Sequence, residues 1–469
     1  MADSFDLVVL GGGLGGYVPA IRAAKKGRSV AIVERDKFGG TCLHRGCIPT
    51  KAFLESAGLL DRIRRAEEYG VQATAKGFDF EAIAARKDKI VSTNEGGVRS
   101  HLRANGVEIV TGEGKLAGAT TVAVGDRRLQ ARDVLLATGS RPKSLPGLEV
   151  DGEVVVTSDH VTQWTELPKS VVIAGAGAVG AEFASMLNDF GAEVTLVEFL
   201  PRVLPLEDAE ISPLVQRDFE KRGIKVRVGA RILSETVKRS KKGVELEVEV
   251  GGKREKLAAE KLLVATGREP LSQGFGFEQA GVEIERGFVK VDGWMRTNVP
   301  HVYAAGDLIG GLMLAHVAAH EGEIAVATML GEKVPPVDYS ALPRATYTRP
   351  EVASLGLSEE AAREGGRAVK VGKFTFRANA KALIHGEADG FAKIVTDERS
   401  GEILGVHLVG PHVTELIGEF SVAKLLESTA LEVGIAVHPH PTLSEALAEA
   451  ALDVFGEAIH VPPRRKPSS

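Results

Sequence analysis

A repeated glycine-rich pattern constrains the fold of this chain more than any other feature. The stretches "FDLVVLGGGLGGYVPAIRAAKKGRSVAIVER" and "SVVIAGAGAVGAEFASMLNDFGAEVTLVEF" each combine an apolar strand, a GxGxxG turn, a helix and a second strand. Counted from the first glycine of GxGxxG, a helix-ending glycine follows after 16 residues and a glutamate after 23 in both. One such turn is weak support, but the two together predict paired dinucleotide-binding βαβ units.

Each glycine of the pattern has a separate physical task. The first allows a tight turn, the second lets the backbone approach a pyrophosphate, and the third lets helix and strand pack closely. The phosphates then lie at a helix N-terminus, where amide donors and the helix dipole favour negative charge. The glutamate either accepts hydrogen bonds from ribose hydroxyls or merely ends a strand, and the identical offsets favour the first interpretation. The predicted positions are Gly11, Gly13, Gly16 and Glu34 in the first unit and Gly175, Gly177, Gly180 and Glu198 in the second.

The length of 469 residues exceeds what one core supports, so about three domains are expected. A net charge of −5 gives no reason to expect nucleic acid or an anionic membrane as partner. No apolar run approaches the roughly 20 residues of a membrane span, and the N-terminal segment lacks the basic region of a signal or transit peptide. We therefore expect a cytoplasmic, reducing location, and we interpret the terminal "VPPRRKPSS" as a loose tail.

Two further stretches repeat each other. "DVLLATGSRP" (133–142) and "KLLVATGREP" (261–270) are apolar strands that end in Ala-Thr-Gly, a basic residue and proline. Generic strand exits are the alternative, but the repetition favours two chain crossovers between dinucleotide domains. A third segment, "TNVPHVYAAGDLIG" (297–310), ends in a Gly-Asp pair whose Asp307 could either bind a cofactor polyol or cap the next helix.

The only two cysteines of the chain, Cys42 and Cys47, lie five positions apart in "GGTCLHRGCIPTK". Residues i and i+5 of a straight helix have Cα atoms about 8.6 Å apart, whereas a disulfide needs less than about 7 Å. A bridge therefore requires a distorted segment, as Gly46 and Pro49 would permit. Such a short strained ring is easily reduced and suits redox work, although two buried bystander thiols remain the alternative.

Taken together, these motifs resemble the FAD-dependent pyridine nucleotide-disulfide oxidoreductases, and within them the members that oxidise dihydrolipoyl groups. The resemblance runs in order along essentially the whole chain. It comprises the flavin fingerprint at 11–16, CxxxxC at 42–47, the nicotinamide fingerprint at 175–180, a second flavin motif at 297–307 and "HPHPTLSEAL" at 438–447.

The resemblance implies an α/β fold with two Rossmann-like domains and a C-terminal α+β dimerisation domain. We expect an FAD-binding domain at 1–147, an NAD-binding domain at 148–270, a central segment at 271–342 that completes the FAD site, and an interface domain at 343–469. It also implies a homodimer in which the C-terminal histidine reaches the disulfide of the other chain.

By the same resemblance, FAD and NAD are the cofactors, and no metal is expected. Lys51 and Glu182 are expected to pair beside flavin N5, where the lysine charge would support the reduced flavin. A surface lysine and a helix-facing glutamate are the alternative. The remaining contacts expected near FAD are Gly40, Thr41, Gly114, Thr138, Gly139, Ser140, Asp307, Ala315 and His316, with Gly267 expected near the nicotinamide nucleotide.

The implied reaction takes dihydrolipoyl groups and NAD⁺ to lipoyl groups and NADH. His440 would accept a proton from a substrate thiol, since an imidazole with a pKa near 6.5 is a suitable base for a thiol near 8.5. Cys42 would form the mixed disulfide, and Cys47 would remain as a thiolate against the flavin. Glu445 would hold His440, although Thr442 and Glu445 also form a capping-box pattern; one glutamate is not expected to do both.

Several details depart from the family pattern or favour a rival. His44 and Arg45 stand between the cysteines, where extra positive charge could lower the thiolate pKa. Pro19 lies in the first flavin helix, so an irregular or displaced helix start is expected. We expect His438 to be structural and the His440–Pro441 bond to be a candidate for the cis form.

The rival activities are other members of the family and a non-catalytic scaffold. Glutathione-type reductases use NADPH and show arginines after the second strand, whereas Glu198 is followed by Phe-Leu-Pro, with Arg202 the nearest arginine. A mercuric reductase would need further cysteines near the C-terminus. The expected partners are the lipoyl domains and core of a 2-oxo acid dehydrogenase complex, or the carrier protein of a glycine cleavage system.

Overall fold

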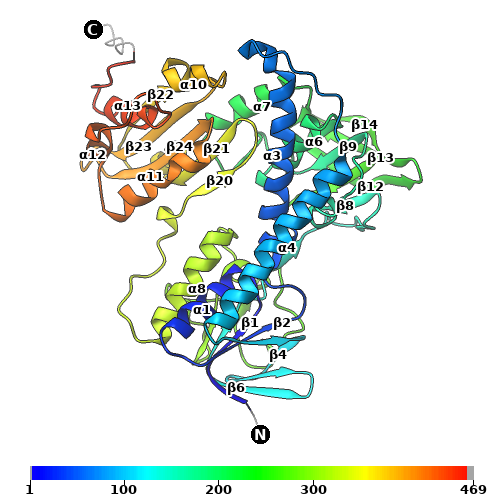
Figure 1. The fold of residues 1–469 in the computed structure, drawn as a ribbon, viewed down its shortest axis with the longest axis vertical. Helices are drawn as coiled ribbons and strands as arrows, with labels where there is room; N and C mark the ends of the chain where they lie inside the picture. Colours follow the sequence, from blue (N-terminus) through cyan, green and yellow to red (C-terminus); the bar gives the residue numbers. More distant parts are fainter. Residues whose placement is uncertain (1–2, 462–469) are drawn as a thin grey trace.

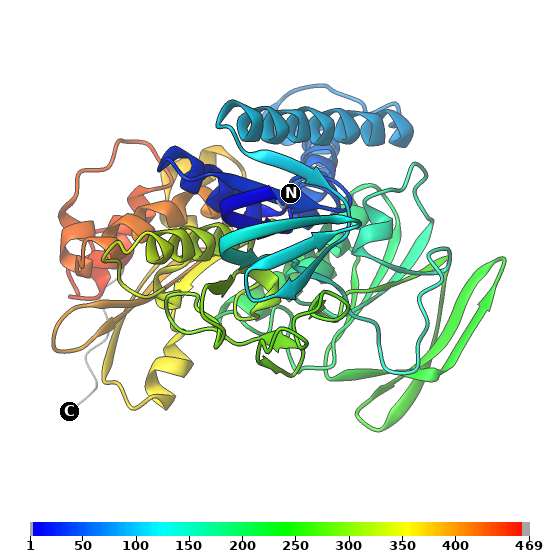
Figure 2. The ribbon, with the colours of Figure 1, turned by 90° about the horizontal axis from the view of Figure 1, so that it is seen from below.

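The computed structural model describes residues 3–461, so all but Val461 of the expected loose tail lies outside the described residues. Three sheet-based bodies surround two central helices (Figures 1 and 2). Within this part of the chain, no helix combines the length and the apolarity needed to cross a membrane.

The first body is a seven-stranded sheet in the order β3-β2-β1-β6-β5-β4, with β19 beside β6. Its parallel half is the predicted dinucleotide-binding unit, and β19 joins it from far along the chain. Helices α1 and α8 pack against each other beside this sheet. The elements are β1 (Asp3–Leu10), α1 (Leu14–Lys25), β2 (Val30–Glu34), β3 (Glu108–Thr111), β4 (Gly114–Gly118), β5 (Thr121–Val124), β6 (Arg127–Leu136), β19 (Val302–Ala304) and α8 (Ala315–Met329).

The second body repeats the first with an all-parallel sheet in the order β11-β10-β9-β15-β8. An antiparallel sheet, β12-β13-β14, extends from it and appears in green in Figure 2. The elements are β8 (Val155–Thr157), α5 (Ser158–Val161), β9 (Ser170–Ala174), α6 (Ala178–Asp189), β10 (Glu193–Val197), α7 (Ile211–Lys221), β11 (Lys225–Arg227), β12 (Ala230–Ser240), β13 (Gly243–Val250), β14 (Lys253–Ala259) and β15 (Lys261–Val264).

The two predicted crossovers between these bodies form one ribbon. β7 (Ser140–Pro142) pairs antiparallel with β16 (Arg268–Pro270), so the chain leaves the first body and returns to it along the same path. The repeated Ala-Thr-Gly segments therefore mark a real structural repeat, and the prediction of two crossovers is confirmed. A short hairpin, β17 (Ile284–Glu285) and β18 (Phe288–Val289), follows the return strand.

The third body is an antiparallel sheet in the order β20-β21-β24-β23-β22. Helix α11 packs against β21 and β24, and α13 packs against β22 and β23. The strands are β20 (Arg344–Thr346), β21 (Glu351–Gly356), β22 (Val369–Thr375), β23 (Phe391–Asp397) and β24 (Ile403–Gly410). The helices are α9 (Glu359–Glu364), α10 (Ala380–Ile384), α11 (Val413–Leu425), α12 (Ala430–Ile435) and α13 (Glu445–Asp453).

Two long helices join the three bodies. α3 (Cys47–Arg64) follows the short α2 (Gly40–His44), and α4 (Phe80–Ala104) packs against α3. Phe53 of α3 and Phe80 of α4 stack with ring centroids 5.5 Å apart. Their core is continuous with Ile173 of the second body and Phe391 of the third. Aromatic and aliphatic burial thus fixes α3 at the centre of the molecule (Figure 1).

The prediction that Pro19 displaces the start of its helix is wrong. α1 and α6 both begin three residues after the first glycine of their fingerprint. Pro19 lies beyond the first turn, inside α1, and is buried against α8. A Cβ atom at Gly322 of α8 would stand 2.7 Å from Cγ of Pro19 and 3.1 Å from the Gly15 carbonyl oxygen. Close packing between the two helices compensates for the lost helical hydrogen bond.

Candidate functional site

The two glycine-rich turns have the same local geometry. Gly11 and Gly175 have φ of 115° and 101°, a region that glycine adopts without strain. A Cβ atom at Gly16 would lie 1.9 Å from the Gly11 carbonyl oxygen, and one at Gly180 would lie 1.9 Å from the Gly175 carbonyl oxygen. The first and third glycines are thus required by sterics in both units.

The two glutamates at the strand ends also occupy equivalent places. One oxygen of Glu34 accepts the Gly12 amide at 2.7 Å, and one oxygen of Glu198 accepts the Ala176 amide at 2.6 Å. The other oxygen of each carboxylate accepts the amide two residues further along, at 2.8 Å. Both carboxylates therefore lie against their glycine loops, where the pattern predicts the ribose of a dinucleotide.

The second glycines leave room for phosphate. Gly13 and Gly177 are the N-cap residues of α1 and α6 and provide no side-chain cap to the first turn. A Cβ atom at Gly177 would meet nothing within 4 Å, and one at Gly13 would touch only Gly40, at 3.8 Å. Two helix N-termini with bare backbone amides fit two pyrophosphates, so the residues present fit FAD and a nicotinamide nucleotide.

The second flavin motif joins the crossover ribbon. Asp307 accepts a hydrogen bond from the hydroxyl of Ser140, and Nε of Arg268 lies 3.5 Å from the same carboxylate. Arg268 also donates to the Ser140 hydroxyl at 2.7 Å. Asp307 begins no long helix, so the polyol interpretation is favoured over the capping alternative. Sequence reasoning missed Arg268, although it is the basic residue of the second Ala-Thr-Gly repeat.

A second missed residue supports the same loop. Glu321 of α8 is buried, and its carboxylate accepts the Gly306 amide at 2.7 Å and the Tyr339 hydroxyl at 2.8 Å. Burial raises the pKa of Glu321 to about 7, against the opposing effect of these hydrogen bonds. The carboxylate thus anchors the backbone immediately before Asp307. The sequence offers only a glutamate in an apolar helix as a signal.

The remaining residues expected near FAD surround the same turns. Thr138 donates to the Leu271 carbonyl at 2.6 Å, and Gly139 follows it with φ of 75°. Gly114 begins β4 in a packed position, because a Cβ atom there would lie 2.4 Å from the Leu10 side chain. Gly267 follows β15 with φ of 125°. Their contacts with a cofactor stay predictions.

Ala315 and His316 form the first turn of α8. This helix begins without a side-chain cap, so its first amides are available to a ligand. The ring nitrogen Nε2 of His316 donates to the Pro343 carbonyl at 2.7 Å. The side chain of His316 thus ties α8 to the segment that enters the third body, and a flavin contact would come from its backbone.

The expected pair between Lys51 and Glu182 is present. Nζ of Lys51 lies 2.7 and 2.9 Å from the two carboxylate oxygens of Glu182, which is itself buried. Burial alone would lower the pKa of Lys51, but the Glu182 carboxylate holds it above the ordinary value. Tyr347 of the third body completes the group: its amide donates to Glu182 at 2.9 Å, and its ring centroid lies 4.6 Å from Nζ of Lys51.

The cysteine segment is distorted as the spacing requires. Cys42 lies in α2 and Cys47 begins α3, with the break at Gly46, whose φ and ψ are −130° and −111°. Gly40 brings α2 against the first fingerprint, because a Cβ atom there would stand 2.7 Å from Cα of Gly13. Thr41 lies in the same short helix. The short helix α2, which carries Cys42, therefore lies beside the phosphate loop of the first unit, and Cys47 follows at the start of α3.

The two cysteines have unequal acidity. A hydrogen bond from the Cys42 thiol and the charge of Lys51 together lower the pKa of Cys47 to about 7, against the opposing effect of burial. The same hydrogen bond and burial raise the pKa of Cys42. The N-terminus of α3 also favours a thiolate at Cys47. These directions favour Cys47 over Cys42 as the thiolate of the reduced pair, and that role stays a prediction.

His44 and Arg45 do not supply charge to the cysteine pair. The ring of His44 is buried and donates from Nε2 to the Phe38 carbonyl at 2.8 Å. Arg45 forms an ion pair with Asp36. The pKa of Cys47 is instead lowered most strongly by Cys42 and Lys51, while burial raises it. The expectation that this departure could tune the thiolate finds no support in the geometry.

His440 and Glu445 form a histidine–carboxylate pair. Nδ1 of His440 lies 2.8 Å from Oε1 of Glu445, while Oε2 of Glu445 accepts the Thr442 amide at 2.8 Å. The capping box is not formed, because α13 begins at Glu445 after Ser444 and without a side-chain cap; Glu445 instead contacts His440 with one oxygen and the Thr442 amide with the other. His438 is bonded at both ring nitrogens, to Glu419 and to the Ala436 carbonyl, which fits the expected structural role. The His440–Pro441 bond is cis.

The histidine and the cysteines lie apart within one chain. His440 belongs to the segment between α12 and α13, and Figure 1 shows these two helices on the outer side of the third body, with the sheet of that body between them and α3. The side chain of His440 is 73% exposed. Each half of the predicted catalytic group is thus built, but one chain does not bring the halves together.

Comparisons with known proteins agree with this geometry. Residues 5–322 match the family described as pyridine nucleotide-disulphide oxidoreductase, and residues 342–451 match its dimerisation domain. A dihydrolipoyl dehydrogenase of Bacillus subtilis is 46% identical over 98% of this chain and 100% of its own length. Another, of Zymomonas mobilis, is 44% identical with the same coverage.

Solved structures agree with the fold. LpdA from Mycobacterium tuberculosis has a TM-score of 0.89 at 31% identity, covering 96% of this chain and 99% of that protein. The flavoprotein disulfide reductase RclA from Escherichia coli has a TM-score of 0.85 over the same shares of the two chains. Its identity of 24% supports similarity of fold alone.

Proposed function

This chain belongs to the pyridine nucleotide-disulphide oxidoreductase family, and from that premise we propose that it is a dihydrolipoyl dehydrogenase, oxidising protein-bound dihydrolipoyl groups with NAD⁺. FAD and NAD are its cofactors. The observation that carries the proposal is the asymmetric pair of Cys42 in α2 and Cys47 at the start of α3: a hydrogen bond from Cys42 and the charge of Lys51 lower the pKa of Cys47, whereas the pKa of Cys42 is raised. A dithiol substrate exchanges electrons naturally with such a pair.

The residues divide the thiol chemistry as follows. A substrate thiol gives its proton to Nε2 of His440, and the thiolate attacks Sγ of Cys42, breaking the Cys42–Cys47 bond and leaving Cys47 as a thiolate. The second substrate thiol then attacks the substrate sulfur of the mixed disulfide and gives its proton to the departing Cys42, which closes the substrate ring and releases Cys42 as a thiol, while His440 keeps the first proton. The substrate has lost two electrons and the cysteine pair has gained them. FAD, when held by the residues of the first unit, would supply the redox chemistry that passes this electron pair on to NAD⁺.

Glu445 prepares His440 for its task. The Nδ1–H group donates to the carboxylate, which leaves Nε2 as the proton acceptor and favours the imidazolium once it forms. Burial opposes the charge on Glu445, but the Thr442 amide and His440 hold the pKa of this carboxyl below its usual range. We therefore assign His440 as the base and Glu445 as the group that orients it.

We further propose a homodimer in which His440 serves the cysteines of the partner subunit. A dimerisation domain is present in the third body. Six apolar side chains around the His440 loop are exposed on α11, on α12 and just beyond them: Val422, Leu425, Leu426, Leu431, Ile435 and Val437. Such a patch marks an interface. It supports burial against a second copy, which would also supply the missing half of the site.

The proposed partners are lipoyl groups of a 2-oxo acid dehydrogenase complex or of a glycine cleavage carrier. We retain the four segments 1–147, 148–270, 271–342 and 343–469 as the proposed domains, and the cofactor contacts predicted above as proposed roles. The cytoplasmic location expected from cysteine usage also stays a prediction.

A glutathione-type NADPH reductase is the second candidate, and Glu198 opposes it. This buried carboxylate would repel a 2′-phosphate, and Arg202, the next arginine along the chain, is hydrogen-bonded to Glu360 instead. A non-catalytic scaffold has no need of the thiolate at Cys47 or of the His440–Glu445 pair. Both observations favour the NAD-dependent dithiol oxidase.

Anaerobic stopped-flow mixing tests the proposal. Dihydrolipoamide should reduce the oxidised holoenzyme and produce a long-wavelength thiolate-to-flavin absorbance, and NAD⁺ should then discharge it. The Cys47→Ser variant should bind FAD and show no such band. Reduction by NADPH with turnover of glutathione disulfide, and none with dihydrolipoamide, would assign the chain to the second candidate.

A further inference from the structure

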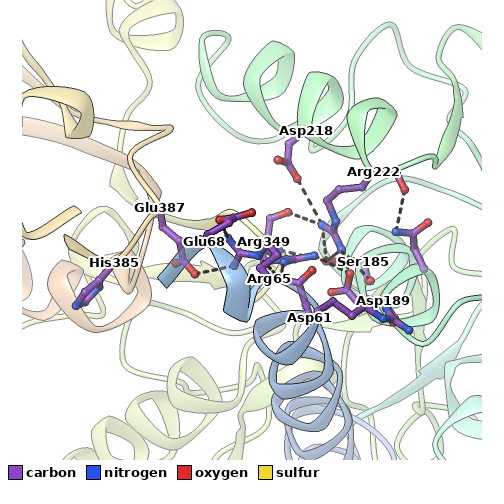
Figure 3. Close-up of polar contacts among 12 residues, drawn as sticks. Asp61, Arg65, Glu68, Ser185, Asp189, Asp218, Arg222, Arg349, His385 and Glu387 are labelled. Carbon is purple, nitrogen blue, oxygen red and sulfur yellow. Dashed lines mark hydrogen bonds and ion pairs between the residues drawn. The ribbon is translucent and has the colours of Figure 1, made fainter. Parts of the chain in front are cut away.

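The segment 347–349, here called the bridge segment, contacts both the central helix α3 and helix α6 of the second body. It follows β20 of the third body and lies between α3 and α6, as Figure 3 shows for Arg349. Along α6 it meets side chains at positions 182, 185 and 189, which lie on one helix face. The contacts are the Tyr347 amide to Oε1 of Glu182 (2.9 Å), the Arg349 amide to Oγ of Ser185 (3.2 Å) and Nη2 of Arg349 to Oδ1 of Asp189 (2.7 Å).

The same segment grips α3 at two places. The Tyr347 ring lies against Nζ of Lys51, and Arg349 forms an ion pair with Asp61. Ten residues of helix separate Lys51 from Asp61, a span of roughly 15 Å. The bridge segment therefore connects α3 to α6 at two levels. One lies near the cysteines, at Lys51, and the other lies further along α3, at Asp61.

The distant tie is a clamp of two carboxylates and two guanidinium groups, formed by Asp61, Asp189, Arg222 and Arg349. Arg222 lies 2.6 Å from Asp189 and donates to the Arg349 carbonyl at 2.7 Å. Asp189 and Arg222 expose only 7% and 12% of their side chains. Asp61 also pairs with Arg65 of its own helix and Asp189 with Arg222. Removing Arg349 therefore leaves both carboxylates partnered and takes away the guanidinium that joins Asp61 of α3 to Asp189 of α6.

The geometry points to Arg349 as a positioning residue that fixes α3 relative to α6 and so holds Lys51 beside Cys47 and Glu182. Cys47 begins α3, Lys51 lies in its next turn, and Glu182 begins the row of α6 side chains that the bridge segment follows. A small shift of α3 would separate Lys51 from Glu182, and misplacement of about 1 Å costs up to roughly 100-fold in rate. This inference rests on the proposed thiol chemistry and adds a residue of the third body to it.

The test measures the thiolate directly in the holoenzyme, without the substrate. Wild type and Arg349→Met are reduced with two electrons from dithionite, and the long-wavelength thiolate-to-flavin absorbance is titrated from pH 5.5 to 9. With Lys51 displaced, the midpoint should rise by about 0.5 pH unit or more. Turnover with dihydrolipoamide should fall roughly tenfold in kcat, with little change in KM for NAD⁺.

Two further variants separate positioning from general destabilisation. Arg344→Met is the matched control, because Arg344 also lies in the third body, is similarly exposed, and pairs with Glu207 of the second body. It should leave the midpoint at the wild-type value. Arg349→Lys, which keeps the charge, should restore part of the shift.

Asp61→Asn provides an independent route, because it removes the α3 side of the clamp and leaves the Arg349–Asp189 pair. It should reproduce the shifted midpoint even if Arg349→Met does not fold. A wild-type midpoint in Asp61→Asn and in every folded Arg349 variant would overturn the inference. If the wild-type protein shows the thiolate band after dithionite but does not oxidise dihydrolipoamide, the proposed function would instead be contradicted.

Discussion

The glycine loop of the first dinucleotide-binding unit is covered by another part of the chain, whereas the glycine loop of the second unit is open. α2 contacts the phosphate loop of the first unit through Gly40 and Gly13, and α8 packs on its helix. In the second unit, the space around Gly177 is empty, and Phe199, after the strand-end glutamate, is 69% exposed. The same fold thus provides an enclosed place for a resident cofactor and an accessible one for a coenzyme that exchanges at each turnover.

The elements packed against each glycine loop, and not the glycine pattern itself, therefore distinguish the two units. Glu34 and Glu198 hold their loops with the same hydrogen bonds. The first unit has gained the cysteine helix, and its cover includes chain from as far away as α8. A duplicated βαβ unit has in this way become two different binding sites.

Alanine at the second glycine of each unit should separate the two sites, with the largest expected effect. Neither Gly13 nor Gly177 has a neighbour within 3.4 Å of a built Cβ atom, so the apoprotein tolerates both changes. Gly13→Ala should weaken FAD retention roughly tenfold or more, because the methyl group would meet the pyrophosphate. Gly177→Ala should keep FAD and raise the KM for NAD⁺.

The ratio of flavin absorbance to protein absorbance after gel filtration, together with NAD⁺ kinetics, measures both effects. Loss of FAD from Gly177→Ala, or unchanged NAD⁺ kinetics in that variant, would break the assignment of the two units.

Glu198→Gln should weaken the preference for NAD⁺. A hydrogen bond to a charged group contributes about 1.5–3 kcal/mol, so kcat/KM for NAD⁺ should fall roughly tenfold or more. The value for NADP⁺ should not fall, because repulsion of the 2′-phosphate is removed. Arg202→Ala is the control and should change the ratio little, since Arg202 is bound to Glu360. Equal kcat/KM for the two coenzymes in the wild type would disprove the role of Glu198.

The thiolate-to-flavin absorbance, which depends on the cysteines beside the first unit, should change with pH. A hydrogen bond from Cys42 lowers the pKa of Cys47 to about 7, so the thiolate is present above that pH and is lost below it. The thiolate-to-flavin absorbance of the reduced holoenzyme should fall from about half its maximum at pH 7 to about a tenth at pH 6. A midpoint near 8.5, that of an ordinary thiol, would contradict the arrangement of Cys42 and Lys51.

Much of the fold could be predicted because its signals are local and repeated. The two fingerprints placed the two parallel sheets, and the repeated Ala-Thr-Gly segments placed the ribbon of β7 and β16. The spacing of Cys42 and Cys47 required the break that occurs at Gly46. Hydrophobic periodicity and the conformational freedom of glycine act within short stretches, so the structure they favour does not depend on distant contacts.

What escaped prediction depends on contacts between distant parts of the chain. Arg268 meets Ser140 across 128 residues, and Tyr347 meets Glu182 across 165. Nothing near Tyr347 in the sequence indicates a carboxylate partner. The expectation for Pro19 failed for the same reason, because helix α8 compensates for the proline from a place that local propensity does not consider.

Mixed dimers test the central claim, that a dithiol is oxidised at a site built from two chains. Cys42→Ser and His440→Gln homodimers should each be nearly inactive, because every site lacks one member. A heterodimer of the two has one site that lacks both and one that keeps Cys42 of one chain and His440 of the other. Co-refolding the two variants should therefore restore one active site per heterodimer, measured as NAD⁺ reduction by dihydrolipoamide. Heterodimers that form and stay as inactive as their parents would contradict the account.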